Sequence, residues 1–290
     1  MPVSIVAPRA PDVTQVRSIR AFINVVADED GRDPLSDQAL TQLTSASVEH
    51  RMAVDDDRLC GYAQLDGRSL EIAAEAHVVG ALLDAFAGRS IMVWAHGHRS
   101  RLTPVLAGRG FTRERELHQL RRGLADPVDV PAIPDGVLIR PFVLGQDEDE
   151  QLRVNAAAFA SHAEQGGWTR ADLEAREQET WFDPSGFLTA WRTETAWPTE
   201  TAWRTGRMAG FHWTKVHPDG DGEVYVLAVD PSAQGLGLGA VLLLHGLAYL
   251  RQRGCPEVLL YVDGSNTAAM RLYERYGFAR HDLDVQWRSP

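Results

Sequence analysis

The distribution of apolar and polar positions along the second half of the chain predicts strands and helices in alternation. Runs rich in apolar and β-branched residues predict strands at 137–140, 187–191, 208–216, 223–229, 258–262 and near Leu283. The stretches between them predict helices at 147–159, 170–182, 239–253 and 267–276. Gly254 and Pro256 end the third of these helices. This order of elements predicts an α/β fold.

The first half of the chain repeats the pattern of the second. The segment Arg58 to Tyr62 resembles Arg207 to Phe211, and each precedes an apolar strand that ends in glycine. The spacing from Trp94 to Gly110 is the same as that from Tyr261 to Gly277, and a Gly-Phe pair closes both segments. An internal repeat of this kind predicts two tandem domains of similar architecture.

Three prolines separate the two repeats. Pro127, Pro131 and Pro134 lie within 123–136, where they disfavour both helix and sheet pairing. We therefore expect an N-terminal domain at 1–125, a linker at 126–136 and a C-terminal domain at 137–290.

Composition narrows the classes of function. The chain of 290 residues is long enough for two modest cores, and its net charge of -11 disfavours nucleic acid as a partner. No stretch approaches the roughly 20 apolar residues of a membrane helix, and residues 1–20 lack the apolar segment of a secretory signal. Cys60 and Cys255 are far apart and fit packing roles in a reducing compartment. We expect a soluble, cytoplasmic protein without a membrane partner.

A glycine-rich turn between the strand at 223–229 and the helix at 239–253 is the strongest candidate for a binding site. Amide groups at a helix N-terminus attract anions, and glycines let a phosphate approach the backbone closely. The turn also fits a dinucleotide fingerprint, with Gly235, Gly237 and Ala240 followed by Asp263. Residues 230–234 separate it from its strand, which disfavours that alternative, whereas a glycine turn without a ligand stays open.

Two other features could be taken for functional sites, but the sequence supports neither interpretation. The histidines at 96 and 98, and at 212 and 217, lack a carboxylate or cysteine partner at metal-ligand spacing, so we expect solvated or core histidines and no metal. The segment from Trp191 to Trp203 repeats a six-residue unit and is interpreted as a duplicated hairpin loop.

Two motifs together resemble the GCN5-related N-acetyltransferase (GNAT) superfamily. The first is Gln234-x-x-Gly237-x-Gly239, and the second runs from Asn266 through Tyr273 to Phe278. The resemblance implies two tandem GNAT-like domains, each a mixed central sheet flanked by helices. It also implies acetyl-CoA as the cosubstrate.

The superfamily's roles carry over to matching positions in this sequence. The resemblance implies that Glu223 is the general base, acting through water, and that Tyr273 is the general acid toward the sulfur of CoA. It implies that the remaining motif positions hold acetyl-CoA: Leu227, Ala228, Val229, Gln234, Gly235, Leu236, Gly237, Leu238, Gly239, Ala240, Asn266, Thr267, Ala268, Ala269, Met270 and Arg271.

Within the superfamily, the whole chain resembles the mycothiol synthases of actinobacteria. The matching strings include 157–169, 181–184, 210–218 and 222–226. The resemblance implies a small-molecule substrate, the cysteinyl amine of a cysteine–glucosamine–inositol conjugate. It places five residues at the substrate: Asp37, Glu164, Lys215, Glu223 and Tyr261. Asp37 has a shorter side chain than the family's acidic residue at that position.

The first half departs from the GNAT pattern. No glycine-rich turn lies between Leu70 and Ile91, and the repeat places Leu106 where the second half has Tyr273. We expect this half to be a structural partner that closes the substrate pocket, in a monomeric enzyme with one active site. The alternatives are an acetyltransferase for another small amine or a protein N-terminus, and a non-catalytic CoA-binding module.

Overall fold

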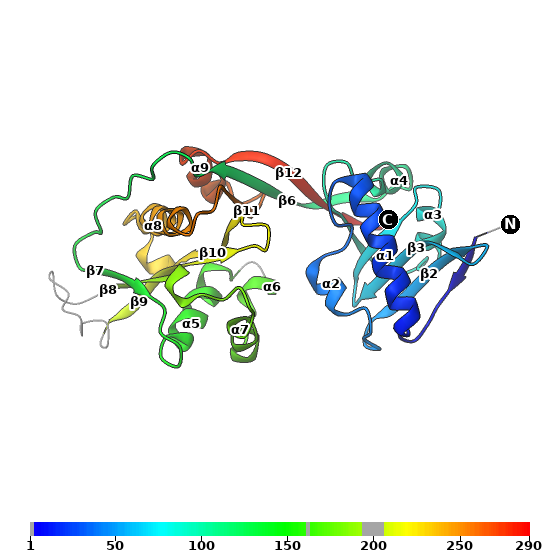
Figure 1. Ribbon diagram of the computed structural model, residues 1–290, viewed down its shortest axis with the longest axis horizontal. Helices are drawn as coiled ribbons and strands as arrows, with labels where there is room; N and C mark the ends of the chain where they lie inside the picture. Colours follow the sequence, from blue (N-terminus) through cyan, green and yellow to red (C-terminus); the bar gives the residue numbers. More distant parts are fainter. Residues whose placement is uncertain (1–2, 161–162, 193–205) are drawn as a thin grey trace. The chain divides into compact units, whose positions relative to one another are not determined.

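The computed structural model describes residues 3–160, 163–192 and 206–290 (Figure 1). The chain forms two compact units. The first comprises Met1–Gln119 with Asp263–Asn266 and His281–Pro290, and the second comprises Leu120–Val262 with Thr267–Arg280.

The first unit contains a mixed sheet with helices on both faces. Its strand order is β1-β2-β3-β4-β5-β12, antiparallel except for the parallel pair of β4 and β5. Its strands are β1 (Ser4–Val6), β2 (Glu49–Asp55), β3 (Arg58–Asp66), β4 (Ser69–Ala74), β5 (Met92–Ala95) and most of β12 (Ala279–Arg288). Its helices are α1 (Val13–Asp30), α2 (Asp37–Thr41), α3 (Val79–Asp84) and α4 (Leu102–Gly108). The strand β6 (Thr112–Gly123) is divided between the two units after Gln119.

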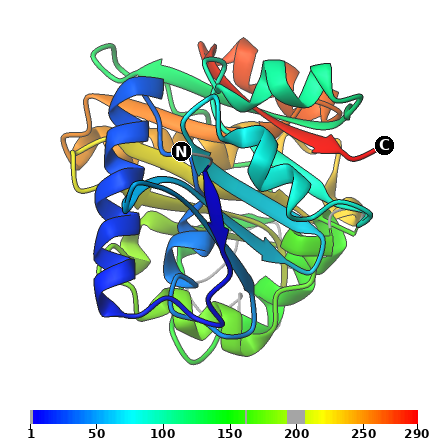
Figure 2. The same cartoon turned by 90° about the vertical axis from the view of Figure 1, so that its right-hand side faces the viewer.

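Local sequence explains how the first unit's long helix begins and packs. Asp12 caps α1 by accepting from the amide of Gln15, whose side chain accepts from the amide of Asp12 in return. Ile19 and Ile23 then pack on one face of the sheet together with residues of α2. Figure 2 shows the ribbon of α1 in blue beside the strands of this sheet. The opposite face carries α3 and α4, so both faces of the sheet are covered.

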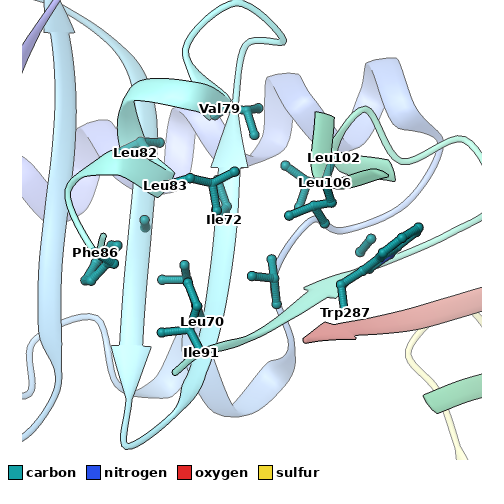
Figure 3. Packing of buried hydrophobic residues seen from close by; sticks show 14 of the residues in the cluster. Leu70, Ile72, Val79, Leu82, Leu83, Phe86, Ile91, Leu102, Leu106 and Trp287 are labelled. Atoms are coloured by element: carbon teal, nitrogen blue, oxygen red, sulfur yellow. The ribbon is translucent and has the colours of Figure 1, made fainter. Parts of the chain in front are cut away.

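The chain's last strand belongs to the first unit, which the expected boundary at 137–290 did not anticipate. β12 pairs with β5 from Val285 opposite Ala95 to Arg288 opposite Met92. Trp287 packs in the core of the first unit with residues of α4, among them Leu102 and Leu106 (Figure 3). The second unit therefore ends before the sequence of the second repeat does, because the last strand joins the sheet of the first unit.

Charged side chains also attach β12 to the first unit. Arg32 forms ion pairs with Asp282 and Asp284 at 3.2 and 2.9 Å. His96 lies 3.3 Å from Asp284 and 3.7 Å from Glu71. Burial alone would lower the pKa of His96, but the carboxylates of Asp284 and Glu71 outweigh it and raise the pKa to about 9. We therefore expect His96 to be a cation at neutral pH.

The second unit contains a mixed sheet in the order β11-β10-β9-β8-β7, in which only β10 and β11 are parallel among the pairs described here. Its strands are β7 (Val137–Pro141), β8 (Phe187–Arg192), β9 (Arg207–Val216), β10 (Gly222–Val229) and β11 (Glu257–Asp263). Its helices are α5 (Glu148–Ala158), α6 (Ala163–Gly166), α7 (Arg170–Glu177), α8 (Leu238–Gln252) and α9 (Thr267–Arg275), with 3-10 turns η1 (Pro184–Gly186) and η3 (Pro231–Ala233).

Two hydrophobic layers cover the sheet of the second unit. On one face, Phe211 and Trp213 of β9 pack with Val154 of α5 and Leu173 of α7. On the other face, α8 and α9 pack against alternate residues of β11, which are Val258, Leu260 and Val262.

The predicted elements of the second half are confirmed, with one substantial difference in length. The predicted helix 170–182 begins at Arg170, where Thr169 and Asp172 form a capping box, and ends at Glu177. The chain then turns, with the amide of Phe182 bonded to the carbonyl of Glu179. Trp181 and Phe182 instead pack their rings against Trp213. Tertiary packing of the aromatic rings has overridden the local helical tendency.

Both cysteines are buried in hydrophobic clusters, Cys60 in the first unit and Cys255 in the second, which confirms their expected packing roles. Burial raises the pKa of both thiols. No helix in the described part of the chain is both long and apolar enough to cross a membrane.

Candidate active site

The sheet of the second unit opens between β10 and β11. The parallel pairing joins Gly222 to Val258 and Glu223 to Leu259, at the start of β10. The antiparallel pairing of β10 with β9 continues to Val229. The register between β10 and β9 shifts at Tyr225, which is an extra residue of a β-bulge. A bulge bends its strand, so this one accounts for the separation of β10 from β11.

The glycine-rich turn follows β10 and opens α8. Gly235 and Gly237 have φ of 85° and 73°, a region that favours glycine, and Gly237 is the N-cap of α8. In the described part of the chain, the amides from Gly235 through Gly239 have no hydrogen-bond acceptor; the amide of Ala240 is the next to find one, the carbonyl of Gly237 at 3.1 Å. The turn is exposed, and Leu236 is 46% accessible. These unpaired amides can receive an anion such as a pyrophosphate.

The start of α8 is in contact with both β10 and α9. A Cβ on Gly239 would lie 3.8 Å from Val229 and 3.7 Å from Leu272. Val224, Met270 and Tyr273 belong to one hydrophobic cluster with α8. The strand, the turn and the second motif's helix, which are separate in sequence, therefore meet in one region of the second unit.

Glu223 lies where β10 and β11 begin to separate. Its side chain is buried, with the residue 7% exposed, and its Oε2 is 2.8 Å from Nε2 of His217. A buried carboxylate needs a partner, and His217 supplies one. Lys215, directly opposite Glu223 in the β9 register, points its ammonium at the rings of Trp181 and Tyr225, at 5.1 and 5.7 Å.

Tyr273 is on the buried side of α9 and is 7% exposed. Its ring packs against Phe278 with centroids 5.6 Å apart. Burial raises the pKa of the phenol, so it keeps its proton at neutral pH. In the described residues its hydroxyl has no hydrogen-bond partner, although a buried tyrosine usually has one. The hydroxyl is thus available as a donor to a bound group.

Three of the predicted substrate residues share one face of the sheet. Side chains alternate along a strand, so Lys215 lies on the face of Trp213, and Glu223 lies opposite Lys215. On β11, Val258, Leu260 and Val262 pack on α8 and α9, so Tyr261 lies on the opposite face, which is the face of Glu223. Tyr261 is 40% exposed. Lys215, Glu223 and Tyr261 therefore face the same side on adjacent strands.

The remaining predicted site residues either lie elsewhere in the fold or have side chains that the structure does not describe. α2 begins at Asp37 and α6 contains Glu164, but the side chains of both residues lie outside the described part of the structure, as does most of the Trp191–Trp203 repeat. Asn266 is grouped with the first unit, whereas Thr267, Ala268, Ala269, Met270 and Arg271 form the first turns of α9 in the second.

Sequence reasoning missed the partner of Glu223. His217 was interpreted as a solvated or core residue because it lacks metal-ligand spacing. Its position just past β9, where the chain reverses into β10, was the available signal. The expectation of a core histidine holds for His212: its Nδ1 donates to the carbonyl of Leu242, and burial lowers its pKa to about 4. Among the described residues no group of three or more His, Cys, Asp or Glu could hold a metal ion.

Comparisons with solved structures show the fold. A GCN5-related N-acetyltransferase from Sphaerobacter thermophilus superimposes with a TM-score of 0.71 at 22% identity, covering 98% of this chain and 95% of its own. A tandem GNAT protein from the clavulanic acid biosynthesis pathway superimposes with a TM-score of 0.68 at 16% identity, covering 99% of this chain and 98% of its own. The expected architecture of two tandem GNAT-like domains is confirmed.

Comparisons of sequence show the family. The Acetyltransferase (GNAT) family model matches residues 161–278. The chain is 46% identical to a mycothiol acetyltransferase of Thermomonospora curvata, over 95% of this chain and 94% of the relative. It is 43% identical to one of Geodermatophilus obscurus, over 96% and 95%. The chain therefore belongs to the mycothiol acetyltransferases, a family of GNAT enzymes.

Proposed function

We propose that this GNAT acetyltransferase transfers acetyl from acetyl-CoA to the cysteinyl amine of the cysteine–glucosamine–inositol conjugate, giving mycothiol and CoA. The observation that carries the proposal is that one unit holds all three features an acetyl transfer needs: a turn of unpaired amides at the start of α8, the buried carboxylate of Glu223 on β10 and the unpaired hydroxyl of Tyr273 on α9. The relatives' name supplies the substrate.

The second unit has a place suited to acetyl-CoA. The space beside Gly235 and Gly237 is open, since a Cβ on either would meet nothing within 4 Å, and the amides there are unpaired. We assign the pyrophosphate to Gln234 through Ala240, and the pantetheine arm and thioester carbonyl to the backbone of Leu227, Ala228 and Val229. Bound there, acetyl-CoA supplies an activated acetyl group to the nucleophile.

The chain's residues then have to move two protons. Glu223 accepts, through a water, the proton that the substrate ammonium gives up, which leaves the amine lone pair free to attack. Because an α-amine has a pKa near ~8, this base need not be strong. Tyr273 donates its hydroxyl proton to the departing thiolate. When the amide bond forms and the C–S bond breaks, the nitrogen loses its second proton to solvent. Glu223 ends protonated and Tyr273 deprotonated; solvent takes the proton from Glu223 and returns one to Tyr273, so the overall reaction releases one proton.

Lys215, Glu223 and Tyr261 share the face on which we place the conjugate, and Asp37 and Glu164 remain predicted contacts. Carboxylates suit an ammonium group and hydroxyls, both rich in hydrogen-bond donors.

We also propose that each chain has one functional site, because the first unit lacks the corresponding features. Its β3–β4 pairing runs from Gly61 to Asp66 without a bulge, and Ser69 occupies the register position of Glu223. α3 begins at the buried Val78 and Val79, not at an exposed glycine turn. The first half then acts as a structural partner in the enzyme.

The substrate assignment is tested by comparing amines. Purified protein is given acetyl-CoA with the conjugate, with the same compound lacking the cysteinyl group, or with a peptide bearing a free N-terminus. We expect kcat/KM for the conjugate to exceed the others by about a hundredfold or more, because the site's polar groups would be left unpaired by the shorter or unrelated amines. A preference for the peptide would assign the protein to N-terminal acetylation.

A further inference from the structure

The pair formed by Glu223 and His217 is a feature that the roles assigned above do not use. The carboxylate is buried, and His217 is its only side-chain partner in the part of the chain that the structure describes. Lys215, the one cation directly opposite it, is directed to the rings of Trp181 and Tyr225. The orientation of Glu223 therefore depends on a single neighbour.

The backbone of His217 is fixed by the reversal between β9 and β10. Its amide donates to the carbonyl of Asp221 at 2.8 Å, and its own carbonyl accepts from the amide of Gly220 at 3.0 Å. The side chain of His217 is partly exposed, at 26% of its area, whereas the side chain of Glu223 is 10% exposed. A ring anchored in this way can hold the carboxylate in one rotamer while remaining in contact with solvent.

The chemistry of the pair sets the direction of the hydrogen bond. An ionised carboxylate only accepts, so Nε2 of His217 carries the hydrogen and Oε2 of Glu223 accepts it. This hydrogen bond engages Oε2 and lowers its basicity, so Oε1 is the oxygen that we assign to the water that takes the substrate's proton. One proton passes from the ammonium to the water, and one from the water to Oε1, with no change of oxidation state.

From this geometry we infer that His217 is a positioning residue for acetyl transfer, which directs Oε1 of Glu223 to its proton-transfer role by holding Oε2. The inference rests on the proposed function of Glu223 as the base. Hydrogen bonds to charged groups of this kind contribute roughly ten- to hundredfold to an equilibrium or a rate. A base that must be oriented loses turnover rather than substrate binding when its partner is removed.

The test compares kcat and KM of His217→Ala, His217→Gln and the wild type. We expect His217→Ala to lower kcat by about tenfold or more, with KM for acetyl-CoA and for the amine within about twofold of wild type. His217→Gln should recover most of the loss, because its carboxamide nitrogen can also donate to Oε2. His98→Ala is the matched control, since His98 also lies 2.8 Å from a carboxylate, that of Asp282, but in the first unit. Its kcat should equal the wild-type value.

A second comparison separates positioning from a loss of fold. If His217 acts through Glu223, His217→Ala should have no further effect on kcat in a Glu223→Ala background. An undiminished kcat in His217→Ala, a loss confined to KM, failure of glutamine to recover activity, or full additivity with Glu223→Ala would each overturn the inference. The variants are compared on whichever amine the wild type acetylates, the conjugate first. Failure of the conjugate as a substrate then rejects the proposed substrate, and it leaves the comparison between variants to decide the role of His217.

Discussion

We propose that Glu223 and Tyr273 carry the proton transfers, and both residues are buried in the second unit. Sequence could propose them because each lies at a fixed place in a recognisable motif, one opening a strand and the other within a helix. Sequence placed His217 just past a predicted strand but could not pair it with Glu223, since that contact depends on the turn that returns the chain from β9 to β10. Contacts between adjacent strands depend on register, which a single residue's identity does not reveal.

Replacing Glu223 by Gln removes the base and keeps the shape of the side chain. We expect kcat to fall by about a hundredfold, near the lower end of the range for general-base catalysis, because the amine is partly neutral at pH 7. Affinity for acetyl-CoA should stay within about twofold of wild type. Steady-state kinetics together with equilibrium binding of acetyl-CoA measure the two effects separately. Unchanged turnover would remove Glu223 from the role of base.

Replacing Tyr273 by Phe removes only the hydroxyl. Because that hydroxyl has no partner in the described residues, folding stability should change by less than about 1 kcal/mol. The phenol is protonated at neutral pH and burial raises its pKa further, so it serves as a donor, and its loss should lower kcat by about tenfold or more. Thermal unfolding and initial-rate measurements check both expectations. A fully active Phe variant would show that the departing thiolate takes its proton elsewhere.

At the scale of elements, periodicity was enough to predict the strands and helices of the second half, and the spacing of Trp94 and Gly110 against Tyr261 and Gly277 predicted the repeat. The end of α7 could not be predicted, because it depends on the packing of Trp181 and Phe182 against Trp213. The bulge beside the opening of the sheet could not be derived from the residues, since it is one extra residue, Tyr225, in the register of β10 with β9.

The glycine turn provides a matched test at this scale. Gly237 and Gly254 lie at opposite ends of α8, with φ of 73° and 86° and open space beside each Cα. Alanine at either position should cost about 1 kcal/mol of folding stability, since alanine disfavours this backbone conformation. Only Gly237→Ala should weaken acetyl-CoA binding, by about tenfold, because it distorts the amides that hold the pyrophosphate. Calorimetric titration of both variants checks this, and equal affinities would contradict the assignment of the turn.

At the scale of the whole molecule, the sequence did not reveal that the last strand pairs in the sheet of the first unit. β12 follows the second repeat in sequence, yet it pairs with β5 and brings Asp282 and Asp284 to Arg32 and His96. Its pattern predicts a strand equally well in either sheet, so only tertiary pairing decides to which sheet it belongs.

The buried His96 makes the stability of the first unit depend on pH. The pKa of His96 is about 9 in the folded chain and near ~6.5 when unfolded, so folding favours the cation. Its contribution, on the order of 3 kcal/mol, should be fully present below about pH 6.5 and lost as the pH rises through about 9. Thermal unfolding from pH 6 to 10 should show wild type and His96→Gln converging at high pH. The exposed His98→Gln is the control, and a constant gap between wild type and His96→Gln would refute the assignment.

We propose that the second unit of this chain catalyses acetyl transfer from acetyl-CoA to the cysteinyl conjugate. The most direct measurement follows CoA thiol release and the mass of the amine product, with purified protein and both substrates. We expect one acetylated conjugate for each CoA released, and we expect both signals to fall by about a hundredfold in Glu223→Gln. Tight acetyl-CoA binding without thiol release above background would contradict the claim and identify the protein as a non-catalytic CoA-binding module.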